Sequence, residues 1–175
     1  MANIQGYKAL LNPTTAQSGL LEQYATAAIW TWNWGLAQKR QGYSKTGRSP
    51  NYVMLSRALT KAKKNGDSWL YDIPAVLLQQ VLIDLDKAYK SFFVSTKLGG
   101  NSQFPQLKMP EESRKEFRLY GSIQVTDTHI KLPKLGWIKL AEKGTLPTEY
   151  AKLHHIAILQ MGNTWSACVI CAHSG

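Results

Sequence analysis

Several features that mark other protein classes are scarce or absent in this sequence of 175 residues. Its two cysteines are too few for a disulfide scaffold. No apolar run approaches the roughly 20 residues that a membrane-spanning helix needs. The first segment, MANIQGYKALLNP, has neither a positively charged start nor a long apolar core, so we expect no signal peptide. These absences predict a cytoplasmic protein.

Acidic residues are missing from one long stretch, between Gln23 and Gly66. The basic residues there are Lys39, Arg40, Lys45, Arg48, Arg57, Lys61, Lys63 and Lys64. The whole chain has 21 Lys and Arg against 11 Asp and Glu, a net charge of +10 and a pI near 9.6. Solvated surfaces normally mix charges of both signs, so an unmixed basic stretch favours contact with the phosphates of a nucleic acid.

Recognisable catalytic and metal-binding patterns are also absent. No G-x-S-x-G, Walker A or G-x-G-x-x-G motif occurs. Asp84 and Asp86 would diverge by about 200° on a helix, so they cannot share one metal, and we expect them at a solvated edge of the helix. Cys168 and Cys171 form a C-x-x-C pair near His173, but on a strand the two cysteines point to opposite faces. We favour buried thiols there over a zinc site, which needs four converging ligands, and we expect no cofactor or metal in this chain.

Hydrophobic periodicity predicts one strand followed by three helices. The strand covers Ile4–Leu11, and a capping box formed by Thr14 and Gln17 begins a helix that ends at Gly42. Trp30 and Trp34 share a face of this helix and Trp32 lies roughly opposite. The other two helices are predicted from Pro50 to about 66 and from Pro74 to about 93.

After a loop over 96–116 the apolar period changes to two, which predicts strands. They cover 117–120, 123–125, 129–132, 137–140, 155–160 and 165–171, with MGNT as a hairpin turn. LPKLGW (132–137) reads as a stiff turn that leaves Lys131, Lys134 and Lys139 on the exposed side.

This order of elements predicts an α+β fold. Its simplest form is a small antiparallel β-barrel or curled sheet with a helical bundle inserted after the first strand. Antiparallel barrels with a basic outer surface are a common scaffold for nucleic acids. We expect Trp137, Ile156, Ile158 and Trp165 in its core, each contributing roughly 1.5–3 kcal/mol.

Five segments resemble, in order and spacing, the amino-terminal half of the TnpB proteins, which are transposon-encoded, RNA-guided DNA nucleases related to type V CRISPR effectors. The segments are YKALLNPTTAQ, IWTWNWGLAQKRQGYSKTG, WLYDIPAVLLQQVLIDLDKAYKSFF, FPQLK and IKLPKLGWIKL. The resemblance covers nearly the whole chain. LPKLGW and LQQVLIDLDKAYKSFF are its most specific parts.

The resemblance implies a wedge-type, OB-like barrel formed by residues 1–13 and 96–175, and a helical recognition domain inserted at 14–95. In the family this half holds a structured guide RNA, helps to form the channel for the guide–target duplex, and reads a short motif that flanks the target DNA. Such a duplex is held by its shape and backbone, while base pairing reads its sequence.

The resemblance also assigns roles to individual positions. Those near the flanking motif are Tyr52, Ser56, Gln79, Tyr120 and Gly121, of which Gln79 suits direct readout because Gln can pair with adenine edges. The expected contacts to RNA or DNA backbones are Lys39, Arg40, Arg57, Lys61, Lys64, Lys131, Lys134 and Lys139. Ala75 and Val76 depart from the more polar or aromatic character of the family, so the flanking motif can differ here.

In the family a RuvC-like nuclease domain and a zinc-ribbon segment follow, and both are absent from these residues. The resemblance therefore implies that cleavage needs a second polypeptide with a RuvC-like domain, which would also bind the divalent metal. A truncated, inactive copy is the simpler explanation. A stand-alone DNA-binding regulator or architectural protein, independent of RNA, is the alternative from a different class.

Overall fold

A computed structural model of the chain describes residues 3–101, 103–121, 123–150 and 152–173. Its elements are β1 (Asn3–Asn12), α1 (Thr15–Thr46), α2 (Tyr52–Lys64), the 3-10 helix η1 (Ser68–Asp72), α3 (Ala75–Lys97), β2 (Glu116–Leu119), β3 (Gln124–Val125), β4 (His129–Leu132), β5 (Gly136–Leu140), β6 (Lys152–Met161) and β7 (Thr164–His173). The predicted order of strand, three helices and six strands is confirmed for these residues. The short η1 was not predicted.

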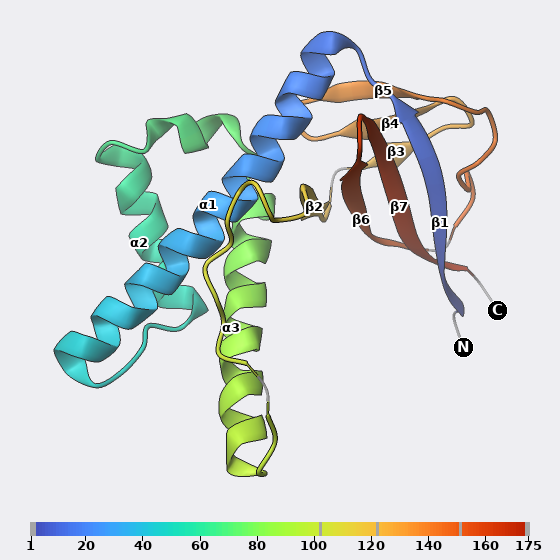
Figure 1. Cartoon of the computed structure of the whole chain (residues 1–175). Helices are drawn as coiled ribbons and strands as arrows, with labels where there is room; N and C mark the ends of the chain where they lie inside the picture. Colours follow the sequence, from blue (N-terminus) through green and yellow to red (C-terminus); the bar gives the residue numbers. More distant parts are fainter. Residues whose placement is uncertain (1–2, 102, 122, 151, 174–175) are drawn as a thin grey trace. The chain divides into compact units, whose positions relative to one another are not determined.

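The chain divides into two compact units, which we call the sheet unit (1–26 and 114–175) and the helical unit (27–113). α1 begins in the first unit and continues into the second as one helix (Figure 1). The predicted domain boundaries lay after residues 13 and 95. The predicted domains included residues 1–2, 102, 122, 151 and 174–175, which lie outside the described residues. The assignment of wedge and recognition domains stays a prediction.

The sheet unit contains one antiparallel sheet in the order β2-β6-β7-β1-β5-β4-β3. β1 lies between β7 and β5, so the first and last strands of the chain are neighbours (Figure 1). β1 pairs with β7 from Asn3↔His173 to Leu10↔Ser166, and then with β5 at Leu11↔Leu140. Among the described residues the pairing leaves the sheet open, with β2 and β3 at its ends. Closure into a barrel is therefore not confirmed.

Strand alternation builds the core of the sheet unit. Ile156, Ile158 and Trp165 are buried as predicted. The prediction for Trp137 is wrong, because its side chain is 43% exposed. In β5 the buried positions are Ile138 and Leu140, and the period of two turns Trp137 to the outer face.

The predicted capping box begins α1. The backbone N–H of Gln17 donates to Thr14 Oγ1 at 3.1 Å, and the N–H of Thr14 donates to Gln17 Oε1 at 3.0 Å. Two turns later the Tyr24 hydroxyl donates to the carbonyl of Pro133 at 3.0 Å, and its ring meets Phe117 edge-on. These bonds attach the first turns of α1 to the sheet.

The helical unit corrects three predicted helix boundaries, one of which is the end of α3, at Lys97 rather than at about residue 93. α1 does not end at Gly42 but continues to Thr46, and Gly47 follows with φ +73°. Gly42 is a glycine for packing reasons, since an added Cβ would lie 2.7 Å from the Pro50 ring. α2 starts at Tyr52 rather than Pro50, because the Asn51 side chain accepts the N–H of Met54 at 3.1 Å and caps the helix.

The three helices of this unit pack through aliphatic side chains. Leu55 and Leu59 form the buried side of α2, and the buried aliphatic side chains of α3 are Leu77, Leu78, Leu82 and Leu85. At Gly35 an added Cβ would lie 2.8 Å from Leu85, so glycine permits the close approach of α1 and α3. Trp30 and Trp34 stack with their ring centroids 6.1 Å apart, as the predicted shared face requires.

Candidate nucleic-acid interface

A basic face on α2 is formed by three exposed side chains, Arg57, Lys61 and Lys64. Helical geometry places them within about one third of the helix circumference, opposite the buried Leu55 and Leu59. We call these three residues the α2 basic face. Because α2 contains no acidic residue, nothing on the helix itself offsets its positive charge.

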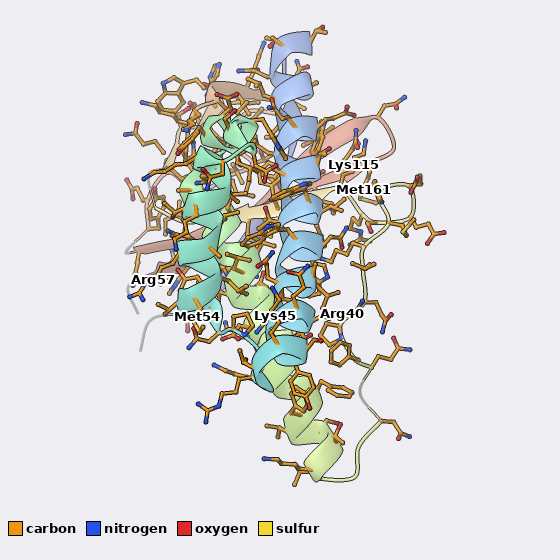
Figure 2. The ribbon with its side chains drawn as sticks, turned by 90° about the vertical axis from the view of Figure 1, so that its left-hand side faces the viewer. Arg40, Lys45, Met54, Arg57, Lys115 and Met161 are labelled. Atoms are coloured by element: carbon orange, nitrogen blue, oxygen red, sulfur yellow. The ribbon has the colours of Figure 1, made fainter. Side chains whose placement is uncertain are left out.

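The end of α1 adds further cations to the helical unit. Arg40 and Lys45 are both exposed there. Figure 2 shows them on the last turns of α1, with Met54 and Arg57 on α2. The structure thus keeps Arg40 on the surface, where a phosphate could reach it.

Lys39 does not fit its predicted role as a backbone contact. Its side chain is 3% exposed, and its ammonium donates to Asp86 Oδ1 at 3.0 Å and to the Pro50 carbonyl at 2.8 Å. The same ammonium lies 4.6 Å from the centre of the Tyr89 ring. The period of α1 turns Lys39 inward while the next residue, Arg40, faces solvent. We therefore leave Lys39 out of the interface.

Asp86 is the acidic partner inside this network. Burial alone would raise the pKa of its carboxyl group, but hydrogen bonds from Lys39 and Lys90, together with their positive charges, outweigh burial and lower the pKa below its usual value. Lys90 contributes from the solvent side, at 3.2 Å from Asp86 Oδ2. Asp86 was expected to be a solvated edge of the helix, and the structure corrects this to a buried ion pair.

A second basic surface lies on the outer face of β3, β4 and β5. Lys131 pairs with Trp137 across β4 and β5, and its ammonium lies 5.9 Å from the centre of the indole ring. His129 pairs with Lys139 in the same ladder. Directly opposed residues share a face of the sheet, so these four side chains lie together. We call Lys131, Trp137, Lys139 and His129 the sheet platform.

Lys134 occupies the turn between β4 and β5. The N–H of Leu135 donates to the Leu132 carbonyl at 3.2 Å, and Pro133 stands at the second position of the turn. Lys134 has φ +62°, a conformation that normally favours glycine or asparagine and that costs a lysine of the order of 1 kcal/mol. The turn predicted from LPKLGW is confirmed, and it holds this lysine exposed at its tip.

The residues predicted near a flanking DNA motif are distributed over both units. Tyr52 and Ser56 lie one turn apart on α2 and are half-buried. Gln79 is exposed on α3. Tyr120 and Gly121 belong to the sheet unit, directly after β2. The structure thus groups Tyr52 with Ser56 and groups Tyr120 with Gly121, and it leaves the motif-reading role itself untested.

Tyr120 belongs to a cluster of rings and cations. Its ring stacks on His155 at 5.0 Å with an interplanar angle of 27°. Burial lowers the pKa of His155, and the positive charges of Arg118 and His154 lower it further. His155 is consequently neutral at pH 7. The adjacent Gly121 has φ +88°, which only glycine adopts at little cost.

Trp32 and Asn33 hold the FPQLK segment against α1, a role that the sequence pattern did not assign to them. The indole N–H of Trp32 donates to the Gln106 carbonyl at 2.8 Å, and the Lys108 ammonium lies 4.2 Å from the centre of its ring. The Asn33 side chain exchanges two hydrogen bonds of 2.8 Å with the backbone of Lys108. Trp32 faces away from the Trp30–Trp34 pair, as predicted. This orientation lets its side chain tether the FPQLK segment to α1.

The prediction of buried thiols is confirmed for Cys171, whereas Cys168 is half-buried. Cys171 is buried, burial raises the pKa of its thiol, and its Sγ lies 3.6 Å from His173 Nε2. The same His173 nitrogen lies 2.8 Å from the Tyr7 hydroxyl. Within the described ranges of the chain, no group of three or more His, Cys, Asp or Glu side chains could hold a metal ion. Nor does any described helix have the length and apolarity needed to cross a membrane.

Comparison with known proteins shows which family and which relatives this chain is similar to. A family described as "Helix-turn-helix domain", of the IS605 OrfB type, matches residues 1–48. InsQ of Escherichia coli (strain K12), whose name describes an RNA-guided DNA endonuclease, is 29% identical over 142 residues. These matches confirm the resemblance of the chain to the amino-terminal half of the TnpB family.

The match to InsQ covers 79% of this chain and 34% of InsQ. A625R of Paramecium bursaria Chlorella virus 1, which is named as a transposase, is 27% identical over 133 residues, or 71% of this chain and 29% of its own length. The chain thus spans about a third of the length of these curated relatives.

The described part of the range that matches the helix-turn-helix family contains only one helix. The described residues of this range, 3–48, contain β1 and the single uninterrupted helix α1, and the next helix begins only at Tyr52. A turn and a second helix therefore lie outside the matched range. The basic residues that follow in α2 belong to this second helix.

Proposed function

We propose that this chain is the nucleic-acid-binding module of a TnpB-type, RNA-guided DNA-targeting system. Its ligands would be a structured guide RNA and the target DNA. The observation that supports this best is the α2 basic face, three exposed cations on one side of a helix without acids. The relationship to InsQ, whose name describes an RNA-guided DNA endonuclease, supports the RNA-guided part of the proposal.

Within this function the two units would divide the work. The sheet unit would act as the wedge domain, with Lys131, Lys134 and Lys139 against RNA phosphates. The helical unit would act as the recognition domain, with Arg40 and the α2 basic face against the nucleic-acid backbone. A lysine or arginine beside a phosphate releases counterions whatever the sequence, so these contacts would provide affinity rather than specificity.

Reading of the flanking motif would fall to Gln79, Tyr52 and Ser56, helped by Tyr120 and Gly121. Gln79 is exposed and can form a bidentate pair with an adenine edge in a major groove. Changing it should alter the preferred flanking motif and leave RNA affinity nearly intact.

Strand cleavage would come from a RuvC-like domain on another polypeptide. That domain would bind the divalent metal, which polarises a phosphate and activates water. The test is to mix this chain, its RNA and a RuvC-bearing polypeptide with guide-matched DNA and magnesium. Cleavage is expected only in the complete mixture, and cleavage by this chain alone would contradict the proposal.

The first experiment is binding to the structured RNA encoded beside the gene. We expect tight binding whose log affinity falls linearly with log salt concentration, with a slope of about −0.7 to −0.9 per phosphate contacted. Unrelated transcripts of equal length are the control. A flat salt dependence, or equal affinity for the unrelated transcripts, would argue against the proposed function.

The RNA content of the purified protein separates the proposed function from the alternative one. The helix-turn-helix match supports a stand-alone DNA-binding regulator. RNA-free protein that binds duplex DNA with sequence preference would favour that alternative. Co-purification with RNA would favour the guide-RNA function.

A further inference from the structure

Trp137 is exposed on the outer face of the sheet platform. Its side chain is 43% exposed, although LPKLGW led us to expect it in the core. A single exposed apolar side chain is ordinary on a protein surface, but an exposed indole with cations beside it offers a flat ring on which a base can stack. We infer that Trp137 is a stacking site for an unpaired nucleobase of a single-stranded stretch of nucleic acid.

The surroundings of Trp137 support a nucleic acid rather than a protein partner. Lys131 is directly opposite on β4, with its ammonium 5.9 Å from the ring centre, and Lys139 lies two residues along the same strand, about 7 Å away. Both lysines are exposed. An aromatic face between cations on a sheet combines a stacking surface for a base with positive charge for its phosphates.

Acidic residues do not offset this charge on the face itself. The register positions next to the platform hold Gln124, opposite Lys131, and Asn12, opposite Lys139. Neither the four residues of the sheet platform nor Gln124 and Asn12, all in the described part of the chain, carry a carboxylate. The nearby Asp127, in the turn before β4, lies 3.4 Å from Lys143 and is therefore partly neutralised.

The backbone under Trp137 is held in place before any ligand binds. The carbonyl of Trp137 accepts a hydrogen bond of 2.8 Å from the side-chain amide of Gln17. The same Gln17 side chain caps α1 through its oxygen. One residue thus fixes β5 to the start of α1, which reduces the entropy that ordering the ring on binding would cost.

This inference rests on the proposed function but goes beyond it, since phosphate contacts alone do not require an aromatic ring. The test is fluorescence anisotropy with the full chain and labelled oligonucleotides of about 12 nucleotides, within the site sizes of single-strand binders. The probes are an unstructured RNA, a DNA of the same sequence, and a blunt duplex. The variants are Trp137→Ala, Trp137→Phe and, as a control, Met161→Ala, an apolar residue that is also exposed in the sheet unit, at the end of β6 (Figure 2).

We expect Trp137→Ala to weaken binding of single strands about fivefold or more, because one stacked base contributes that much. Trp137→Phe should stay within about threefold of the wild type, since a smaller ring still stacks. The salt slope should not change in either variant, because stacking releases no counterion. Binding of the duplex should be unaffected, and comparison of the RNA and DNA arms identifies the source of the base.

Different failures have different meanings. If the wild type binds with a normal salt slope but Trp137→Ala binds equally well, the stacking inference is overturned and the proposed function stands. An equal loss on single strands and duplex would also overturn it, because the ring would then not require an unpaired base. If the wild type binds none of the probes and not the RNA encoded beside the gene, the proposed function fails as well. A thermal melt of Trp137→Ala matching the wild type ensures that a loss is not unfolding.

Discussion

Lys39 differs from the other basic residues between Gln23 and Gly66 in being buried, at 2% exposed. A buried ammonium is tolerated only when its donors are satisfied and a counter-charge is close. Asp86 supplies the charge, the Pro50 carbonyl accepts a second bond, and the Tyr89 ring covers a further side. At the scale of the residue, a lysine in a basic stretch is here a structural element of the helix packing.

This assignment predicts that Lys39→Met destabilises the chain by about 3 kcal/mol, since it leaves the Asp86 carboxylate with only its solvent-side partner Lys90. The double variant Lys39→Met/Asp86→Leu should recover most of that loss. The free energies of unfolding come from urea titrations.

Lys45→Met, at an exposed position, is the matched control and should change stability by less than about 0.5 kcal/mol. If Lys39→Met left stability unchanged and instead reduced the salt slope of nucleic-acid binding, Lys39 would be a phosphate contact after all.

At the scale of the element, α2 separates its functions by face. Leu55 and Leu59 anchor it, and the opposite side presents Arg57, Lys61 and Lys64 to solvent. The start of the helix is stabilised by its Asn51 cap rather than by charge. Removing the cations should therefore affect binding without unfolding the helix.

We predict that Arg57→Gln/Lys61→Gln flattens the salt slope of RNA binding by about 1.4 to 1.8, because two phosphate contacts are lost. A matched pair, Lys87→Gln/Lys97→Gln, removes two exposed charges from α3 and should leave the slope nearly unchanged. The measurement is affinity at several salt concentrations. Equal effects of the two pairs would indicate that only the net charge matters and that α2 forms no specific contact.

At the scale of the whole molecule, each unit contains a titratable group whose pKa folding shifts. Asp86 lies in the helical unit and has a pKa lowered from 3.8; His155 lies in the sheet unit and has a pKa lowered from 6.5. A group with a lowered folded pKa binds its proton more readily when unfolded. Stability is therefore fully present above the unfolded pKa and is lost as the pH falls through the folded one.

We predict two separate declines in the free energy of unfolding on acidification. The first begins below about pH 6.5 and belongs to His155, and the second begins below about pH 4 and belongs to Asp86. Denaturant titrations between pH 7 and pH 3 measure both. His155→Phe, which keeps a ring against Tyr120, should abolish only the first decline. A first decline that persists in this variant would assign it to another group.

Local signals in the sequence were enough for much of the architecture. The Thr14/Gln17 capping box, the MGNT hairpin turn and the Pro133-containing turn all formed where predicted, because each depends on a few adjacent residues. The period of two located all six later strands to within a few residues. The basic character and the relation to the TnpB family could also be inferred from sequence.

Tertiary structure decided what periodicity alone leaves open, namely which partner each side chain meets. Gly42 was predicted to end α1, yet the helix continues to Thr46, and the Pro50 ring packs against that glycine. Lys39 and Trp137 both lie elsewhere than predicted: Asp86, 47 positions away in sequence, holds the lysine in the interior, and Trp137 lies on the outer face of the sheet opposite Lys131 of β4. Burial depends on contacts between residues distant in sequence, so composition and local pattern fixed the elements of this protein, and only their packing decided which cations and aromatic rings remain at the surface to bind.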